Sequence, residues 1–221
     1  HTTSFFYSTM FPIKANSVCD LSAGRYFATF AEWVGFCFDA AEPSAITPTT
    51  AQSISAWLSG PRLVAECGQM SITAINELMQ AMPFDTIQTD NDLPFDQLSR
   101  NISTVIRRIV VQPTTSLEDI TIIIAAQKPY IAHFLIDFAT NALYWEQLGI
   151  DTQLLPQDVV QLCRQASVIL QFPFTEANIL SIIEQCQPTA IAFESGMEKA
   201  VGIRLFDEIA VVIEQLDEAG Y

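Results

Sequence analysis

The stretch Val168-Ile-Leu-Gln-Phe-Pro-Phe-Thr-Glu-Ala-Asn-Ile179 starts as a short apolar run, passes through a proline and enters a helical pattern. The helix is expected over Thr175–Gln185, and the next apolar run, Ala190–Phe193, has the length of a buried strand. Two parallel neighbouring strands need a crossover, which is usually a helix. The stretch therefore predicts a βαβ unit of a parallel sheet.

The same alternation of strand and helix runs through the whole chain of 221 residues. Further strands are expected at Met10–Ala15, Trp33–Phe38, Leu63–Cys67, Thr86–Thr89, Val105–Val111, Ile131–Asp137 and, ahead of the first helix named, Ser167–Gln171. Further helices are expected at Leu21–Glu32, Thr49–Ser59, Ser71–Met82, Phe95–Asn101, Ser116–Gln127, Gln157–Arg164 and Leu205–Glu218.

One α/β domain over residues 1–221, folded as a closed (β/α)8 barrel, accounts for all of these units. The alternative is an open doubly wound sheet, which would need a glycine-rich first turn where the chain reads Asn16-Ser17-Val18. The barrel places functional groups in the loops that follow the carboxyl ends of its strands.

Composition restricts the partners. The formal net charge is −15, which disfavours nucleic acid and anionic membrane surfaces but leaves a small-molecule ligand open. No apolar run is long enough to cross a bilayer, and the first residues lack the pattern of a secretory signal. The 5 cysteines form no CxxC pair, which favours reduced thiols and a cytoplasmic location. A monomer or a homodimer is expected.

Asp137 is the leading candidate for chemistry because it ends an expected strand. A carboxylate there could act as general acid or base, or it could cap Thr140 or Asn141 or pair with an arginine. Strand alternation turns one of Arg107 and Arg108 toward the barrel interior, where it needs an acidic partner or an anionic ligand. Asp137 on the neighbouring strand is the expected partner.

Two other residues, Cys19 and His133, carry side chains that can take part in proton transfer. Cys19 follows the first strand and could serve as a base or nucleophile, although the adjacent Asp20 opposes a thiolate. His133 shares a strand face with Asp137 but lies roughly 13 Å away along an extended chain, so it is expected in the bottom layer of the barrel. No metal-ligand spacing and no dinucleotide or phosphate-loop motif is present.

Laid end to end, these segments resemble phosphoribosylanthranilate isomerase, a barrel enzyme of tryptophan biosynthesis. The opening stretch follows the family's V-I-L-A-G-G-L-T-P-E-N-V, and Ala190-Ile-Ala-Phe-Glu-Ser-Gly-Met-Glu198 follows A-V-D-V-S-S-G-V-E. Gly202 to Ile209 continues like G-x-K-D-x-x-K-I. Weaker similarities lie at Trp33–Phe38, Ile87-Gln88 and Phe134–Asp137.

The resemblance implies an Amadori aldose–ketose isomerisation by a general base and a general acid, with no cofactor and no metal. Asp137 matches the family's acid, and Cys19 would be a displaced base. Ser195 and Gly196 match the turn that holds a phosphate after the eighth strand, where Lys199 would offset Glu194. Arg108 is the remaining candidate for contact with an anionic ligand.

The same alignment shows where this chain departs from the family. Without gaps, Ala15 takes the position of the catalytic cysteine, and Glu42-Pro43-Ser44 stands where the family has S-P-R. Phe172-Pro173 replaces the G-G of the phosphate site, and proline has no N–H to donate. Glu194 adds a like charge beside any phosphate.

These departures predict a diverged active site with weak or no activity in the family reaction. Two alternatives stay open from the sequence. One is a working isomerase that uses Asp137 and Cys19. The other is a different enzyme or binding barrel for a non-phosphorylated, cationic ligand held among Asp20, Asp137 and Glu194.

Overall fold

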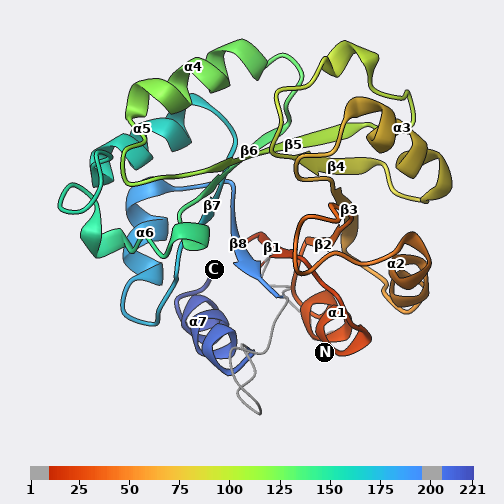
Figure 1. Ribbon diagram of the computed structural model, residues 1–221. Helices are drawn as coiled ribbons and strands as arrows, with labels where there is room; N and C mark the ends of the chain where they lie inside the picture. Colours follow the sequence, from red (N-terminus) through yellow and green to blue (C-terminus); the bar gives the residue numbers. More distant parts are fainter. Residues whose placement is uncertain (1–9, 196–205) are drawn as a thin grey trace, which may run out of the picture.

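The computed structural model describes residues 10–195 and 206–221 (Figure 1). Within them, eight parallel strands pair in chain order, and the last strand pairs with the first to close a barrel. The helices surround this ring of strands (Figure 1). The (β/α)8 barrel predicted from the alternation is confirmed, and the open sheet is wrong.

The elements have the following bounds. The strands are β1 Ile13–Asn16, β2 Trp33–Cys37, β3 Arg62–Glu66, β4 Thr86–Thr89, β5 Thr104–Val110, β6 His133–Asp137, β7 Val168–Gln171 and β8 Ala190–Glu194. The α-helices are α1 Leu21–Ala28, α2 Pro48–Ser55, α3 Ile72–Ala81, α4 Leu117–Gln127, α5 Pro156–Gln165, α6 Ile179–Cys186 and α7 Phe206–Glu218. Among the described residues, no helix combines the length and apolar character that crossing a bilayer requires.

One expected helix is wrong. Phe95–Asn101 forms only a 3-10 turn at Phe95–Gln97, after which Leu98 is extended. The side chain of Asn76 on α3 donates to the Gln97 carbonyl at 3.0 Å and accepts from the Ser99 N–H at 2.8 Å. These side-chain bonds give the backbone partners outside a helical ladder, and the segment stays a loop.

The barrel interior has an apolar bottom layer. Its buried residues come from six strands and form a cluster separate from the main core: Trp33, Val64, Ile106, Leu135, Ile169, Ala190 and Ala192. His133 at the start of β6 lies at this end, where its ring contacts Trp33 edge-on and its Nδ1 lies 2.7 Å from the Ser167 hydroxyl. The prediction that His133 belongs to the bottom layer is confirmed.

The polar side chains of the interior lie at the other end. Side chains on a strand alternate between faces, so the residue two positions after an apolar interior residue also points inward. Applied along the barrel, this rule gives a polar ring at the carboxyl ends of the strands, made of Asn16, Cys37, Glu66, Gln88, Arg108, Asp137, Gln171 and Glu194. The fold therefore concentrates its buried polar groups on the face where barrels carry their sites.

Candidate functional site

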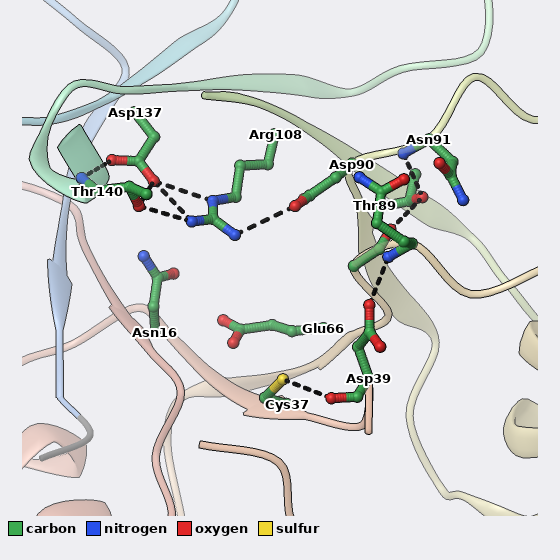
Figure 2. A network of polar contacts seen from close by, with 12 residues as sticks. Asn16, Cys37, Asp39, Glu66, Thr89, Asp90, Asn91, Arg108, Asp137 and Thr140 are labelled. Atoms are coloured by element: carbon green, nitrogen blue, oxygen red, sulfur yellow. Dashed lines mark hydrogen bonds and ion pairs between the residues drawn. The ribbon is translucent and has the colours of Figure 1, made fainter. Parts of the chain in front are cut away.

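A hollow of about 440 Å³ opens at the polar ring, and we call it the mouth cavity. All members of the ring line it except Asp137, which is fully buried beside Arg108. The loops that follow the strands complete its wall with Ser17, Glu42, Pro43, Ser44, Gly68, Asp90, Ala139 and Thr140, and β5 adds Val110. Figure 2 shows Asn16, Glu66 and Arg108 pointing toward this shared space.

Arg108 is held by two carboxylates on opposite sides (Figure 2). Its Nε and Nη2 donate to Asp137 Oδ2 at 3.0 and 2.8 Å, and its Nη1 donates to Asp90 Oδ2 at 3.2 Å. Thr140 completes the arrangement, because its hydroxyl donates to Asp137 Oδ2 at 2.6 Å and its N–H donates to Oδ1 at 3.0 Å. The expected pairing of Asp137 with an inward arginine and with Thr140 is confirmed.

The charge of Arg108 is strongly favoured in this setting. Burial lowers the pKa of the guanidinium, but the carboxylates of Asp137 and Asp90 outweigh burial and raise the pKa overall. Arg107, one residue earlier, points to the helix layer, where its Nε donates to Gln127 Oε1 at 3.1 Å. The guanidinium at the mouth is thus Arg108, and its charge is already paired.

A second buried ion pair joins β1 to β3. The Lys14 side chain is 0% exposed, and its Nζ lies 2.6 Å from Glu66 Oε1 and also donates to Asn16 Oδ1. The other carboxylate oxygen of Glu66 accepts from the Ser17 N–H at 2.9 Å. Asn16 passes the network on by donating from Nδ2 to Gln171 Oε1 at 2.7 Å. One side of the mouth cavity is therefore rigidly tied across three strands.

Gly35 on β2 makes room for this pair, since a Cβ at that position would lie 1.9 Å from Glu66 Oε1. Replacing Gly35 with alanine should displace Glu66 and lower the free energy of unfolding by about 1–3 kcal/mol, the usual cost of overpacking. Gly24→Ala in α1 is the matched control, because its Cβ would meet only flexible Ile54 and Leu58 side chains at 3.1 Å or more. Urea denaturation compares the two, and equal effects would refute the clash.

The mouth cavity is acidic, and two hydrogen-bond acceptors in its lining have no donor among the described residues. Among the described residues, four carboxylates (Glu42, Glu66, Asp90 and Glu194) and one cation, Arg108, line it, and the pairs to Asp137 and Lys14 lie behind this lining. Two buried oxygens there have no hydrogen-bond partner, Gln88 Oε1 and Asp90 Oδ1. Gln88 is 4% exposed, and its cross-strand neighbour is Glu66. A buried acceptor without a donor is costly, so the cavity favours a molecule that carries donors.

Glu194 ends β8 at the rim. Its side chain is exposed to solvent at the mouth cavity, although many protein atoms lie around the carboxyl group. Burial, together with the negative charge of Glu66, raises the pKa of Glu194 to about 6, although the Ser17 hydroxyl and Arg108 act in the opposite direction and Asp137 adds to the rise. At neutral pH this group is mostly ionised and adds negative charge to the rim.

The raised pKa of Glu194 makes stability depend on pH. The folded state binds more protons than the unfolded state between the ordinary value of 4.5 and about 6, so this group costs stability as the pH rises through that window. Glu194→Gln should therefore raise the melting temperature at pH 8 by about 2–4 °C, for a screened gain of at most about 1 kcal/mol, and leave it unchanged at pH 4. Glu184→Gln, at an exposed position of α6, is the control. If the melting temperature of Glu194→Gln is raised at pH 4 as much as at pH 8, the raised pKa of Glu194 is not the cause.

The structure brings neither Cys19 nor Ala15 to the mouth cavity. Ala15 is buried in the main core outside the barrel, so the ungapped placement of Ala15 at the base position is wrong. The inward residue at the end of β1 is Asn16. Cys19 lies beyond the strand, and burial and the charge of Asp20 raise the pKa of its thiol. Asp20 itself caps α1 by accepting from the Ala23 N–H at 2.8 Å and is not part of the cavity lining.

The turn after β8 is described only as far as Ser195. The N–H of Ser195 donates to the Asn16 carbonyl at 2.9 Å, and its hydroxyl donates to the same oxygen. Both donors that a phosphate would use on this residue are therefore already engaged. Gly196 and Lys199, the other residues expected at a phosphate, lie outside the described part of the chain.

Aromatic side chains occupy the end of β7. Phe172 stacks on Phe138 with ring centres 4.1 Å apart and planes 9° apart, and Phe174 contacts Phe172 and Phe193 edge-on. Beside them lies a second hollow of about 300 Å³, which we call the aromatic pocket. It is lined by Ala139, Ala142, Tyr144, Gln171, Phe172, Pro173, Phe174, Ala192, Phe193, Glu194, Glu208, Ile209 and Val212.

Sequence reasoning found Arg108, Asp137 and Glu194 but missed the rest of the ring. The missed ring members are Asn16, Cys37, Glu66, Gln88 and Gln171, and Lys14 and Asp90 beside the ring were missed as well. A signal was present for two of them, because Glu66 and Gln171 stand two residues after the apolar inward positions Val64 and Ile169 of expected strands. Asp90 has a different position, in the loop directly after β4.

Comparisons with known proteins agree on the fold. No family model matches the chain, and no curated protein matches it. Solved phosphoribosylanthranilate isomerases do match: that of Thermotoga maritima at 19% identity and TM-score 0.72, over 95% of this chain and 100% of that one. That of Pyrococcus furiosus matches at 15% identity and TM-score 0.72, over 94% and 99%. A third, at 19% identity and TM-score 0.70 over 95% and 100%, was solved with reduced 1-(o-carboxyphenylamino)-1-deoxyribulose 5-phosphate. At these identities the similarity shows the fold.

Proposed function

We propose that this chain is a diverged barrel of the phosphoribosylanthranilate isomerase type that has lost efficient catalysis of the family's Amadori rearrangement. Its mouth cavity instead binds a small ligand that carries no phosphate. The observation that carries the proposal is the chemistry at the ends of β7 and β8, where the resemblance places a phosphate.

That chemistry opposes a phosphate in three ways. Pro173 has no N–H to donate, and the N–H and hydroxyl of Ser195 both already donate to the Asn16 carbonyl. Glu194 places a carboxylate at the rim. A phosphate there would lose charge-assisted hydrogen bonds and face a like charge, so this end of the barrel lacks the phosphate-binding site that the family reaction needs.

The acid–base pair of the family reaction is also weakly supported. The Asp137 carboxyl group accepts four hydrogen bonds from Arg108 and Thr140 and does not line the mouth cavity, so it is not presented to a ligand there. Asn16 stands where the strand would present a base, and an amide is neutral at all accessible pH. Cys19 lies outside the cavity lining, and its raised pKa disfavours the thiolate that a base requires.

Two assays test the proposal. Expression in a tryptophan auxotroph that lacks this isomerase should give no growth without tryptophan, provided that immunoblotting shows soluble protein. The purified chain, mixed with phosphoribosylanthranilate generated in place, should show no conversion above the uncatalysed rate.

A known isomerase expressed from the same vector is the positive control for both assays. Rescue of growth together with turnover by the purified chain would overturn the proposal in favour of the alternative with Asp137 and Cys19. In that event, Asp137→Asn and Cys19→Ala would show which of the two residues the reaction needs.

A further inference from the structure

The aromatic pocket and the mouth cavity adjoin each other. Ala139, Gln171 and Glu194 line both hollows, so a molecule in one of them reaches the boundary of the other. Glu194 stands at this junction with its side chain exposed to solvent at the mouth cavity. The two hollows differ in chemistry, since one is ringed by carboxylates and amides and the other chiefly by phenylalanine and aliphatic side chains.

The charges and unpartnered acceptors of the mouth cavity favour a cation that carries hydrogen-bond donors. Its carboxylates exceed its cations by three among the described residues, and Arg108 and Lys14 are both engaged in ion pairs. Independently, Gln88 Oε1 and Asp90 Oδ1 are buried acceptors without partners. A protonated amine carries up to three donors and a positive charge, whereas an anion would meet repulsion and find no unpaired cation among these residues.

The aromatic pocket calls for an apolar group. Phe172 is fixed by stacking on Phe138, and Phe174 and Phe193 pack edge-on beside it. Phenylalanine rings give an incoming flat group both a large apolar surface and edge-to-face contacts. A purely polar ligand such as a free sugar would leave this surface unused.

We propose that the two hollows form a single site for a small amphipathic cation. Its protonated amine lies in the mouth cavity beside Glu194, and its aromatic or branched aliphatic group lies against Phe172 and Phe174. The inference rests on the proposed function only in that the mouth binds a ligand without a phosphate. It assigns the chemical class of that ligand.

Isothermal titration with matched probes at pH 7.5 tests the site. 2-Phenylethylamine combines both groups, ethylamine carries the amine alone, and phenylacetate joins the same ring to a negative charge. We expect 2-phenylethylamine to bind at least about 10-fold more tightly than ethylamine, because the ring adds apolar contact area. Phenylacetate should give no measurable binding.

Two variants divide the binding between the hollows. Glu194→Gln should weaken the binding of 2-phenylethylamine by about 10-fold. Phe174→Ala should weaken the binding of 2-phenylethylamine and leave the binding of ethylamine unchanged. Glu77→Gln, at an exposed position of α3, also removes one negative charge but outside both hollows, so it should leave the binding of both amines unchanged. Melting curves of each variant establish that it is folded before binding is compared.

The outcomes separate this inference from the proposed function. Absence of binding by 2-phenylethylamine, equal binding of phenylacetate, or an unchanged affinity in Glu194→Gln would each overturn the amphipathic-cation site. None of these results would be evidence of isomerase activity, so the proposed loss of efficient catalysis would stand. Conversely, turnover of phosphoribosylanthranilate would refute the proposed function, whatever the amine probes show.

Discussion

Replacing Lys14 with methionine should lower the free energy of unfolding by about 3–5 kcal/mol, because it leaves the buried Glu66 carboxylate without a cation. Methionine keeps most of the side-chain volume, so the loss reports charge and hydrogen bonding rather than a cavity. Asn16 loses a donor in the same variant, and its contact with Gln171 should loosen. Urea denaturation at 25 °C and pH 7 measures the change.

A double variant shows that the cost is that of an unpaired charge. Lys14→Met combined with Glu66→Leu removes both ions and should recover most of the lost stability, since apolar pairs often replace buried ion pairs without penalty. Arg100→Met, in the exposed loop before β5, is the control for loss of one positive charge. The interpretation fails if Lys14→Met is as mild as Arg100→Met, or if the double variant is less stable than the single one.

The barrel itself was predictable because its evidence is local. Runs such as Val168–Gln171 and Ala190–Glu194 carry strand periodicity within a few residues, and the helices between them carry theirs. The one helix that failed, Phe95–Asn101, was decided by a side chain elsewhere, Asn76 on α3. Local patterns could not include that contact.

The site was predictable only where two signals coincided. Arg108 and Asp137 stood out because a charged residue within an apolar strand needs a partner on the next strand. Lys14 lay in the same kind of strand but was missed, since its partner Glu66 is 52 residues away, and Asn16 and Gln171 are 155 residues apart. A sequence shows which polar residues must be paired but not which distant residue completes each pair.

The turn after β8, where the resemblance implies a phosphate, illustrates the same limit. Pro173 and Glu194 revealed from the sequence that an anion would be poorly held there. What the sequence could not show is that Ser195 spends both donors on the Asn16 carbonyl, because that contact joins β1 to the end of β8 across the closure of the barrel. The closure that completes the fold thus also occupies the donors that a phosphate at this turn would need.

Replacing Arg108 with methionine should lower the free energy of unfolding by about 2–4 kcal/mol at pH 7. Asp137 is fully buried, and the variant would leave it with hydrogen bonds from Thr140 alone. Asp90 would lose its ion pair as well. Urea denaturation of the variant and the unaltered protein at pH 7 measures this loss.

Arg107→Met is the matched control on the adjacent residue of the same strand. Arg107 donates to neutral acceptors, Gln127 Oε1 and the Thr89 carbonyl, so its removal should cost less than that of Arg108, about 1–3 kcal/mol. The contrast between the two variants isolates the carboxylates of the mouth, because the strand and the side-chain type are the same. If Arg107→Met costs as much stability as Arg108→Met, the ion pairs with Asp137 and Asp90 do not account for the loss.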